Sequence, residues 1–198
     1  MTNLIILLAM GSSLSLQSCK HSDSSTSNMV EHHSHSVIDN KTEHTDNSSV
    51  DSSKFSAVYN NYLGIKNALS KDQNDSASFY AGQLLNMIEV MNTTHLTAEQ
   101  LSVWNKNKSK IKDATLRIKE STGIESQRDQ FISLSLSFHT IILSFKDNSA
   151  PVYYQFCPMA NDGKGAYWIS EQSKISNPYY GKKMISCGST KETINENK

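Results

Sequence analysis

The sequence predicts a mainly α protein: an antiparallel four-helix bundle followed by a turn-rich C-terminal segment with at most one or two short strands. Three observations support this fold class. Apolar side chains recur at three- and four-residue steps over residues 53–146, the spacing of amphipathic helices. Beyond residue 147 the repeat stops, and four of the eight glycines and two of the three prolines lie between residues 157 and 188. From residue 19 to residue 52 the chain is polar, which places the fold in the last three quarters of the sequence.

Residues 1–18 read as a lipoprotein signal peptide rather than as structure. The apolar run Leu4–Met10 is too short to span a bilayer as a helix, which needs roughly 20 residues. The tetrapeptide ending at Cys19 resembles the lipobox of bacterial lipoproteins, which implies cleavage before Cys19 and a lipid on that residue. Met1–Asn3 carries no Lys or Arg, whereas a signal peptide normally begins with positive charge. The alternative to a signal peptide is a buried hydrophobic helix at the N-terminus. The lipobox predicts a periplasmic protein anchored to the inner or outer membrane.

Residues 19–52 form a tract rich in Ser and His that holds five of the seven histidines of the chain. Such a segment buries too little apolar surface to offset the entropy of ordering, so we expect a flexible tether. Its neutral imidazoles, with His32, His33 and His35 closest together, suit weak capture of copper, zinc or nickel. A polar spacer without a metal role explains the same composition equally well.

Four apolar stripes define the predicted bundle over residues 53–146. Short polar breaks separate them, which favours antiparallel neighbours. Thr97 and Gln100 fit a capping box at the start of the third helix. His139 lies at the edge of the fourth stripe, where a partly buried histidine bonded to a neighbour is the simpler interpretation and a metal ligand the outside one. The stripes consist of Phe55, Val58, Tyr59, Tyr62, Leu63 and Leu69; Ala77, Tyr80, Ala81, Leu84, Leu85, Ile88 and Met91; Leu101, Trp104, Ile111 and Ile118; and Phe131, Leu134, Phe138, Ile141, Ile142 and Phe145.

The segment 147–193 is expected to pack on the bundle, with a disordered tail over residues 194–198. Val152, Tyr154 and Phe156 alternate with polar and aromatic neighbours, which indicates a short strand or an extended arm. The glycines and prolines that follow mark tight turns.

Sulfur is concentrated in these turns. Cys157 and Met159 lie two residues apart, and Met184 and Cys187 three apart. If the two turns face each other, two thiolates and two thioethers converge, a soft donor set that suits Cu(I) better than magnesium, calcium or manganese. Zinc would be expected to recruit histidine or more cysteines.

The same stretch resembles a known family. Four motifs in it are similar to the C-terminal signature of the domain of unknown function 3347 family: Cys-Pro-Met, Gly-Ala-Tyr-Trp, Asn-Pro-Tyr-Tyr-Gly and Met-x-x-Cys-Gly. The whole resemblance covers roughly residues 53–193, with the helices first and the signature last. Members occur as secreted proteins and fused to CusB-type adaptors of heavy-metal efflux pumps, which implies an association with copper or silver efflux. By position the matching residues are Cys157, Met159, Asn177, Pro178, Tyr179, Gly181, Met184, Cys187 and Gly188.

A disulfide is the alternative use of Cys157 and Cys187. Exported proteins form disulfides readily, and closing a loop of about 30 residues contributes on the order of 3 kcal/mol. The chain would then be a stapled structural or interaction module of the cell envelope. Its binding surface would be aromatic, made of Tyr153, Tyr154, Tyr167, Trp168, Tyr179 and Tyr180.

The charge balance and the absence of known catalytic motifs argue against two classes of protein, nucleic-acid binders and enzymes. Lys and Arg total 19, as do Asp and Glu, and a balanced chain does not favour nucleic acid as a partner. No nucleophile elbow, zinc-protease helix motif or phosphate loop is present, so we expect no enzyme. The leading hypothesis is a lipid-anchored periplasmic protein that binds copper or silver and serves an efflux-pump adaptor or a metal-transfer partner.

Overall fold

The computed structural model describes residues 48–145 and 150–194, with side chains from residue 55 onward. The predicted signal peptide and nearly all of the predicted tether lie outside the described residues. Within the described part, no helix is both long enough and apolar enough to cross a membrane.

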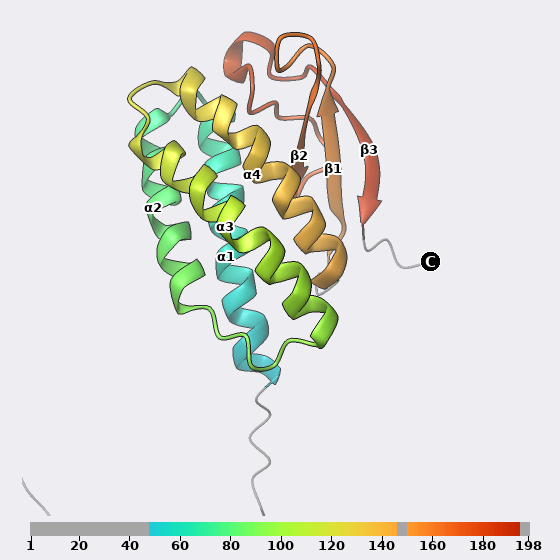
Figure 1. The fold of residues 1–198 in the computed structure, drawn as a ribbon. Helices are drawn as coiled ribbons and strands as arrows, with labels where there is room; N and C mark the ends of the chain where they lie inside the picture. Colours follow the sequence, from blue (N-terminus) through green and yellow to red (C-terminus); the bar gives the residue numbers. More distant parts are fainter. Residues whose placement is uncertain (1–47, 146–149, 195–198) are drawn as a thin grey trace, which may run out of the picture. The chain divides into compact units, whose positions relative to one another are not determined.

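Four helices form the bundle, which confirms the predicted fold class (Figure 1). They are α1 (Ser48–Ser70), α2 (Asn74–Val90), α3 (Ala98–Glu120) and α4 (Ile124–Phe145). Each helix packs mainly on the next one along the chain, as short connections require. The first helix begins at residue 48, earlier than the predicted bundle start at residue 53.

The predicted capping box begins α3. The Oγ1 of Thr97 accepts a hydrogen bond from the Gln100 backbone N–H at 3.2 Å, and the Gln100 side-chain oxygen accepts from the Thr97 N–H at 3.0 Å. These two bonds satisfy donors that every helix start leaves without an intrahelical acceptor.

Aromatic rings fill the space between α1 and α4, whose backbones make few direct contacts. The Tyr62 ring stacks on Phe138 at 4.3 Å and on Phe131 at 5.3 Å between centroids. Phe55 and Phe145 stack at 4.6 Å at the other end of the same seam. Long side chains are needed here because the β-strand Ala166–Ser170 lies against both helices.

The C-terminal segment adds a three-stranded antiparallel sheet of order β2-β1-β3, one strand more than the sequence predicts at most. Its strands are β1 (Val152–Cys157), β2 (Ala166–Ser170) and β3 (Ser189–Ile194), and a 3-10 helix, η1 (Gly181–Met184), precedes β3. The sheet lies beside α4, on the far side of the bundle from α2 (Figure 1). Ile194, expected in the tail, ends β3 and is buried.

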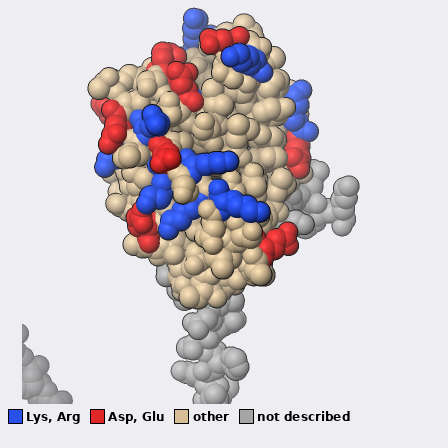
Figure 2. Space-filling model, viewed as in Figure 1, with Lys and Arg blue, Asp and Glu red and all other residues tan. Residues whose placement is uncertain are grey.

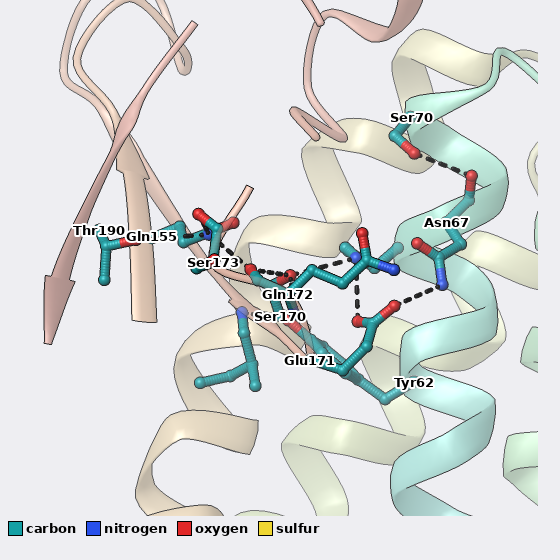
Figure 3. A network of polar contacts seen from close by, with 11 residues as sticks. Tyr62, Asn67, Ser70, Gln155, Ser170, Glu171, Gln172, Ser173 and Thr190 are labelled. Carbon is teal, nitrogen blue, oxygen red and sulfur yellow. Dashed lines mark hydrogen bonds and ion pairs between the residues drawn. The ribbon is translucent and has the colours of Figure 1, made fainter. Parts of the chain in front are cut away.

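A polar network attaches the sheet to α1 (Figure 3). The Lys66 ammonium, 1% exposed, lies 3.1 Å from Oε2 of Glu171 and 3.4 Å from the Ser170 hydroxyl. Burial lowers the pKa of Lys66 below its ordinary value, an effect that Glu171 opposes. The Tyr62 hydroxyl accepts from the Ile169 N–H at 2.9 Å, which anchors β2 directly to α1.

Surface charge is mixed in sign. Figure 2 shows Lys and Arg side chains gathered over the face that α3 presents, with Asp and Glu among them. The α3 sequence supplies four lysines in alternation, at positions 106, 108, 110 and 112. Lys112 is paired with Glu89 of α2.

Candidate functional site

The structure brings Cys157 and Cys187 together. Their sulfurs lie 3.2 Å apart, and both residues are free thiols. Cys157 ends β1 and is fully buried, whereas Cys187 follows η1 and is partly exposed. One sulfur is therefore fixed in the protein interior, and the other can be reached from solvent.

The position of Cys157 follows from the sheet. It pairs with Ala166 at the end of the β1–β2 ladder, so its backbone is held by regular strand geometry. Gly188, at φ +140, brings the chain after Cys187 close to this strand: a Cβ there would lie 2.8 Å from the Phe156 oxygen and 2.9 Å from the Trp168 ring. Only glycine permits so close an approach.

Asn177 fixes Cys187. Its side chain is fully buried, and its amide nitrogen donates to the Cys187 carbonyl at 2.7 Å. Its side-chain oxygen accepts from the backbone N–H of Tyr179 at 2.8 Å and of Tyr180 at 3.3 Å. A single amide thus ties the Asn-Pro-Tyr-Tyr turn to the segment that carries the thiol, because Asn offers a donor and an acceptor at once.

The two methionines lie in the turns on either side of the thiols. Met159 is 49% exposed, and its backbone carbonyl accepts from the Tyr180 hydroxyl at 2.7 Å. Met184 is the last residue of η1 and is partly exposed; its carbonyl accepts from the Cys187 N–H at 3.0 Å. Both thioethers belong to the surface of the thiol-bearing segment rather than to the bundle core.

The thiol pair lies against an aromatic layer. Trp168 is fully buried and meets Tyr179 edge-on, with 6.0 Å between ring centroids. The Tyr179 hydroxyl donates to the Tyr167 carbonyl at 2.5 Å. The hydrogen bond to Cys157, followed by burial, raises the pKa of the Cys187 thiol. Cys187 is therefore a neutral thiol near pH 7, and a cation that binds there has to displace a proton.

His139 has other partners. Its ring stacks on Tyr154 at 3.7 Å with an interplanar angle of 3°, and its Nε2 lies 3.3 Å from a carboxylate oxygen of Glu192. These contacts pack α4 against β1 and β3. The other residues singled out from the sequence, Cys19 and the histidines at positions 32, 33 and 35, lie outside the described residues.

Across residues 48–145 and 150–194, no three or more His, Cys, Asp and Glu side chains are grouped so that they could hold a metal ion.

The aromatic residues predicted to form an interaction surface differ in burial. Trp168, Tyr179 and Tyr154 are buried, and the other three are partly exposed.

Sequence reasoning missed two buried charged residues, Lys66 and Arg128. Lys66 is 1% exposed and Arg128 is 6% exposed. Each lies on the apolar face of its helix, Lys66 four residues after Tyr62 and Arg128 three residues before Phe131. A charge on an apolar stripe was the available signal, because such a group is buried only with partners.

Comparison with known proteins places the helical part in a family. The family described as "Protein of unknown function (DUF3347)" matches residues 58–150, which include most of α1 and all of α2, α3 and α4. The match ends just before β1, so the segment with the thiols lies beyond it. No curated protein and no solved structure matches the chain. Residues 58–150, which carry the four-helix bundle, therefore belong to the DUF3347 family.

Proposed function

We propose that this chain binds a soft monovalent metal ion, Cu(I) or Ag(I), between the sulfurs of Cys157 and Cys187. The observation that carries the proposal is the 3.2 Å separation of the two thiols, one buried and one accessible. Met184 and Met159 provide neutral thioethers from the adjoining turns. Thiolate and thioether ligands select Cu(I) over hard cations.

The geometry needs only a small adjustment to chelate an ion. Metal–sulfur bonds of about 2.3 Å at a tetrahedral angle separate two sulfurs by about 3.8 Å. The thiols, at 3.2 Å, must therefore part slightly. Cys187 can make this movement because it is partly exposed, whereas Cys157 is held in a strand.

Binding replaces thiol protons. Since the pKa of Cys187 is raised, the thiolate is scarce at neutral pH, and the apparent metal affinity increases as pH rises toward that pKa. A site of this kind releases its ion more easily in acid.

The wider setting is part of the same proposal. A lipid on Cys19 anchors the protein in the periplasm, to the inner or the outer membrane, and the His-rich tether adds weak metal-binding imidazoles. The protein buffers the ion or passes it to an efflux-pump adaptor, and it catalyses no reaction. The lipobox and the resemblance to efflux-associated proteins support this setting.

A disulfide-stapled interaction module is the second candidate. The same 3.2 Å separation favours it, because the sulfurs need only a small approach to bond. Tyr153, Tyr167 and Tyr180, which are partly exposed, would then form the binding surface.

Competition with a chromophoric Cu(I) chelator tests the metal proposal. The soluble protein beginning after Cys19 is titrated fully reduced, beside Cys157→Ser, Cys187→Ser and Met184→Leu variants. We expect one high-affinity equivalent that weakens about 100-fold or more when either cysteine is lost, since each ligand in a four-ligand site is worth a few kcal/mol. Met87→Leu on α2 is the matched methionine control and leaves the affinity unchanged.

Two outcomes contradict the metal proposal. In the first, the reduced protein binds Cu(I) no more tightly than a variant that lacks both cysteines. In the second, protein taken directly from the periplasm contains no free thiol and has the mass of an intramolecular disulfide, which supports the stapled module instead.

A further inference from the structure

Arg128 of α4 is the most extensively bonded charged residue in the described part of the chain. Its side chain is 8% exposed. Nε donates to the Pro178 carbonyl at 2.9 Å, and Nη2 donates to the Leu69 carbonyl at 3.1 Å and to Oδ1 of Asp72 at 2.6 Å. Nη1 donates to Glu125 at 2.8 Å. One guanidinium therefore joins α4, the end of α1 and the Asn-Pro-Tyr-Tyr turn.

Asp72 extends this contact to η1. It lies in the α1–α2 turn at φ 61, and its Oδ2 accepts from the Lys182 backbone N–H at 3.1 Å. The chain crosses the ion pair at Gly181, which has φ +54; a Cβ there would lie 2.5 Å from Nη2 of Arg128 and would overlap Asp72. The glycine is required because the turn rests directly on the two charged groups.

Backbone hydrogen bonds connect this ion pair to the thiols. The Gly181 N–H donates to the Asn177 carbonyl at 3.1 Å. Asn177 in turn donates from its side chain to the Cys187 carbonyl at 2.7 Å, and the Cys187 sulfur lies 3.2 Å from that of Cys157. The turn is thus held at one end by the bundle and at the other holds Cys187.

We propose that Arg128 and Asp72 are positioning residues for the thiol site: by clamping the turn 177–182 on the bundle, they fix Cys187 beside Cys157. The proposal rests on the proposed function for its metal-binding consequence. Both residues lie within the family match, although the turn that they hold lies beyond it. The helical region therefore acts as the platform that assembles the site.

The distinguishing measurement is the effective concentration of one thiol at the other, obtained from the dithiol–disulfide equilibrium in glutathione buffers. It needs no metal. We expect Arg128→Lys, which keeps the charge but loses the planar fork, to lower this value tenfold or more, and Asp72→Asn to act in the same direction. A tenfold decrease raises the midpoint potential of the pair by about 30 mV. Cu(I) affinity is expected to fall in parallel.

Two controls separate positioning from general loss of stability. Ile111, fully buried in α3, is replaced by Val or Ala, whichever matches the thermal midpoint of the clamp variant, and should leave the effective thiol concentration unchanged. Lys112→Gln, which breaks an exposed ion pair, controls for charge. If Arg128→Lys does not fold, Asp72→Asn alone provides the comparison.

Equal shifts in the clamp variants and the stability-matched control, or no shift in either, overturn the proposal. If the clamp variants alone change the thiol equilibrium but wild type does not bind Cu(I), the positioning role is supported and the metal function fails. If both readouts change only in the clamp variants, positioning and metal binding are supported together.

Discussion

The bundle and the C-terminal segment are stabilised in different ways. Between the helices most contacts are apolar: the side chains of Leu84, Ile111 and Phe138, among others, are fully buried and need only volume and shape. The C-terminal segment also buries apolar side chains such as Trp168, but it depends in addition on individual polar groups, among them Gln155, Ser170 and Asn177, which are equally buried. A core of the first kind tolerates similar replacements, whereas each polar group of the second kind has few substitutes.

The polar attachments occur at two places. Lys66 and Tyr62 of α1 hold β2. Asp72 of the α1–α2 turn and Arg128 of α4 hold the turn 177–182. The thiol pair belongs to the segment that these two attachments secure. Two anchors of this kind restrict the segment more than one does, which suits a site that depends on one sulfur–sulfur distance.

Phe138→Ala should have the largest effect, because it removes a fully buried ring that stacks on Tyr62. We expect a loss of about 3–5 kcal/mol in the free energy of unfolding, from the lost transfer energy and the cavity left behind. Chemical denaturation followed by far-UV circular dichroism measures it. Leu136→Ala, 50% exposed on the same helix, is the control and should cost well under half as much. Equal losses would show that α4 is not packed as described.

Asn177→Ala tests the C-terminal segment. It leaves two backbone N–H groups and the Cys187 carbonyl without their partner, for a loss of about 2–3 kcal/mol. Unlike Phe138→Ala, it should also expose Cys157, which is fully buried in the wild type. The rate at which a thiol reagent modifies Cys157, measured in Cys187→Ser backgrounds, is the readout. A rate equal to that of Phe138→Ala at matched stability would contradict a local role.

The helices of the bundle could be predicted from the sequence because they follow from the periodicity of apolar residues. Phe131, Leu134 and Phe138 recur at helical spacing, and all three are fully buried in α4. The capping box at Thr97 was equally predictable, because both of its bonds are local. Such patterns can be recognised from the sequence because all the residues of a stripe or a cap belong to one helix.

The sheet was less predictable for a physical reason. In β2 both faces are covered, so Ala166, Trp168 and Ile169 are buried without strict alternation. In β3 the first four side chains are exposed, and the strand forms because β1 is available to pair with it. No local pattern reports a pairing of that kind.

The candidate site was predicted in part. The turn-rich sequence pointed to Cys157 and Cys187, which the structure brings to 3.2 Å. The charge of Arg128 on an apolar stripe signals burial, but the sequence does not identify Asp72 as its partner, since the spacing pattern contains no information about an ion pair between residues 56 positions apart. The sequence could not decide between a metal ligand pair and a disulfide, because both need the same two sulfurs close together.

Acid should weaken the C-terminal attachment selectively, and this is the smallest of the three effects. Burial opposes the ionisation of Asp72, but hydrogen bonds from Arg128 and Lys182 outweigh it and hold the pKa of this carboxyl below its ordinary value of 3.8. The unfolded chain therefore takes up the proton first as pH falls. The stabilisation is complete above 3.8 and is lost as pH falls through the lower, folded-state pKa.

The test compares wild type with Asp72→Asn from neutral pH to below 3.8, by denaturant titration and by the reaction of Cys157 with dithiodipyridine, which modifies thiols in acid. The difference in stability should be on the order of 1 kcal/mol at neutral pH, because the carboxyl is partly exposed and screened, and it should shrink in acid. Glu89→Gln, at an exposed pair on the bundle surface, serves as control and should leave Cys157 protected throughout. A difference that stays constant with pH would mean that the Asp72 charge does not hold the turn, and that Arg128 and the side chain of Asn177 fix it without that charge.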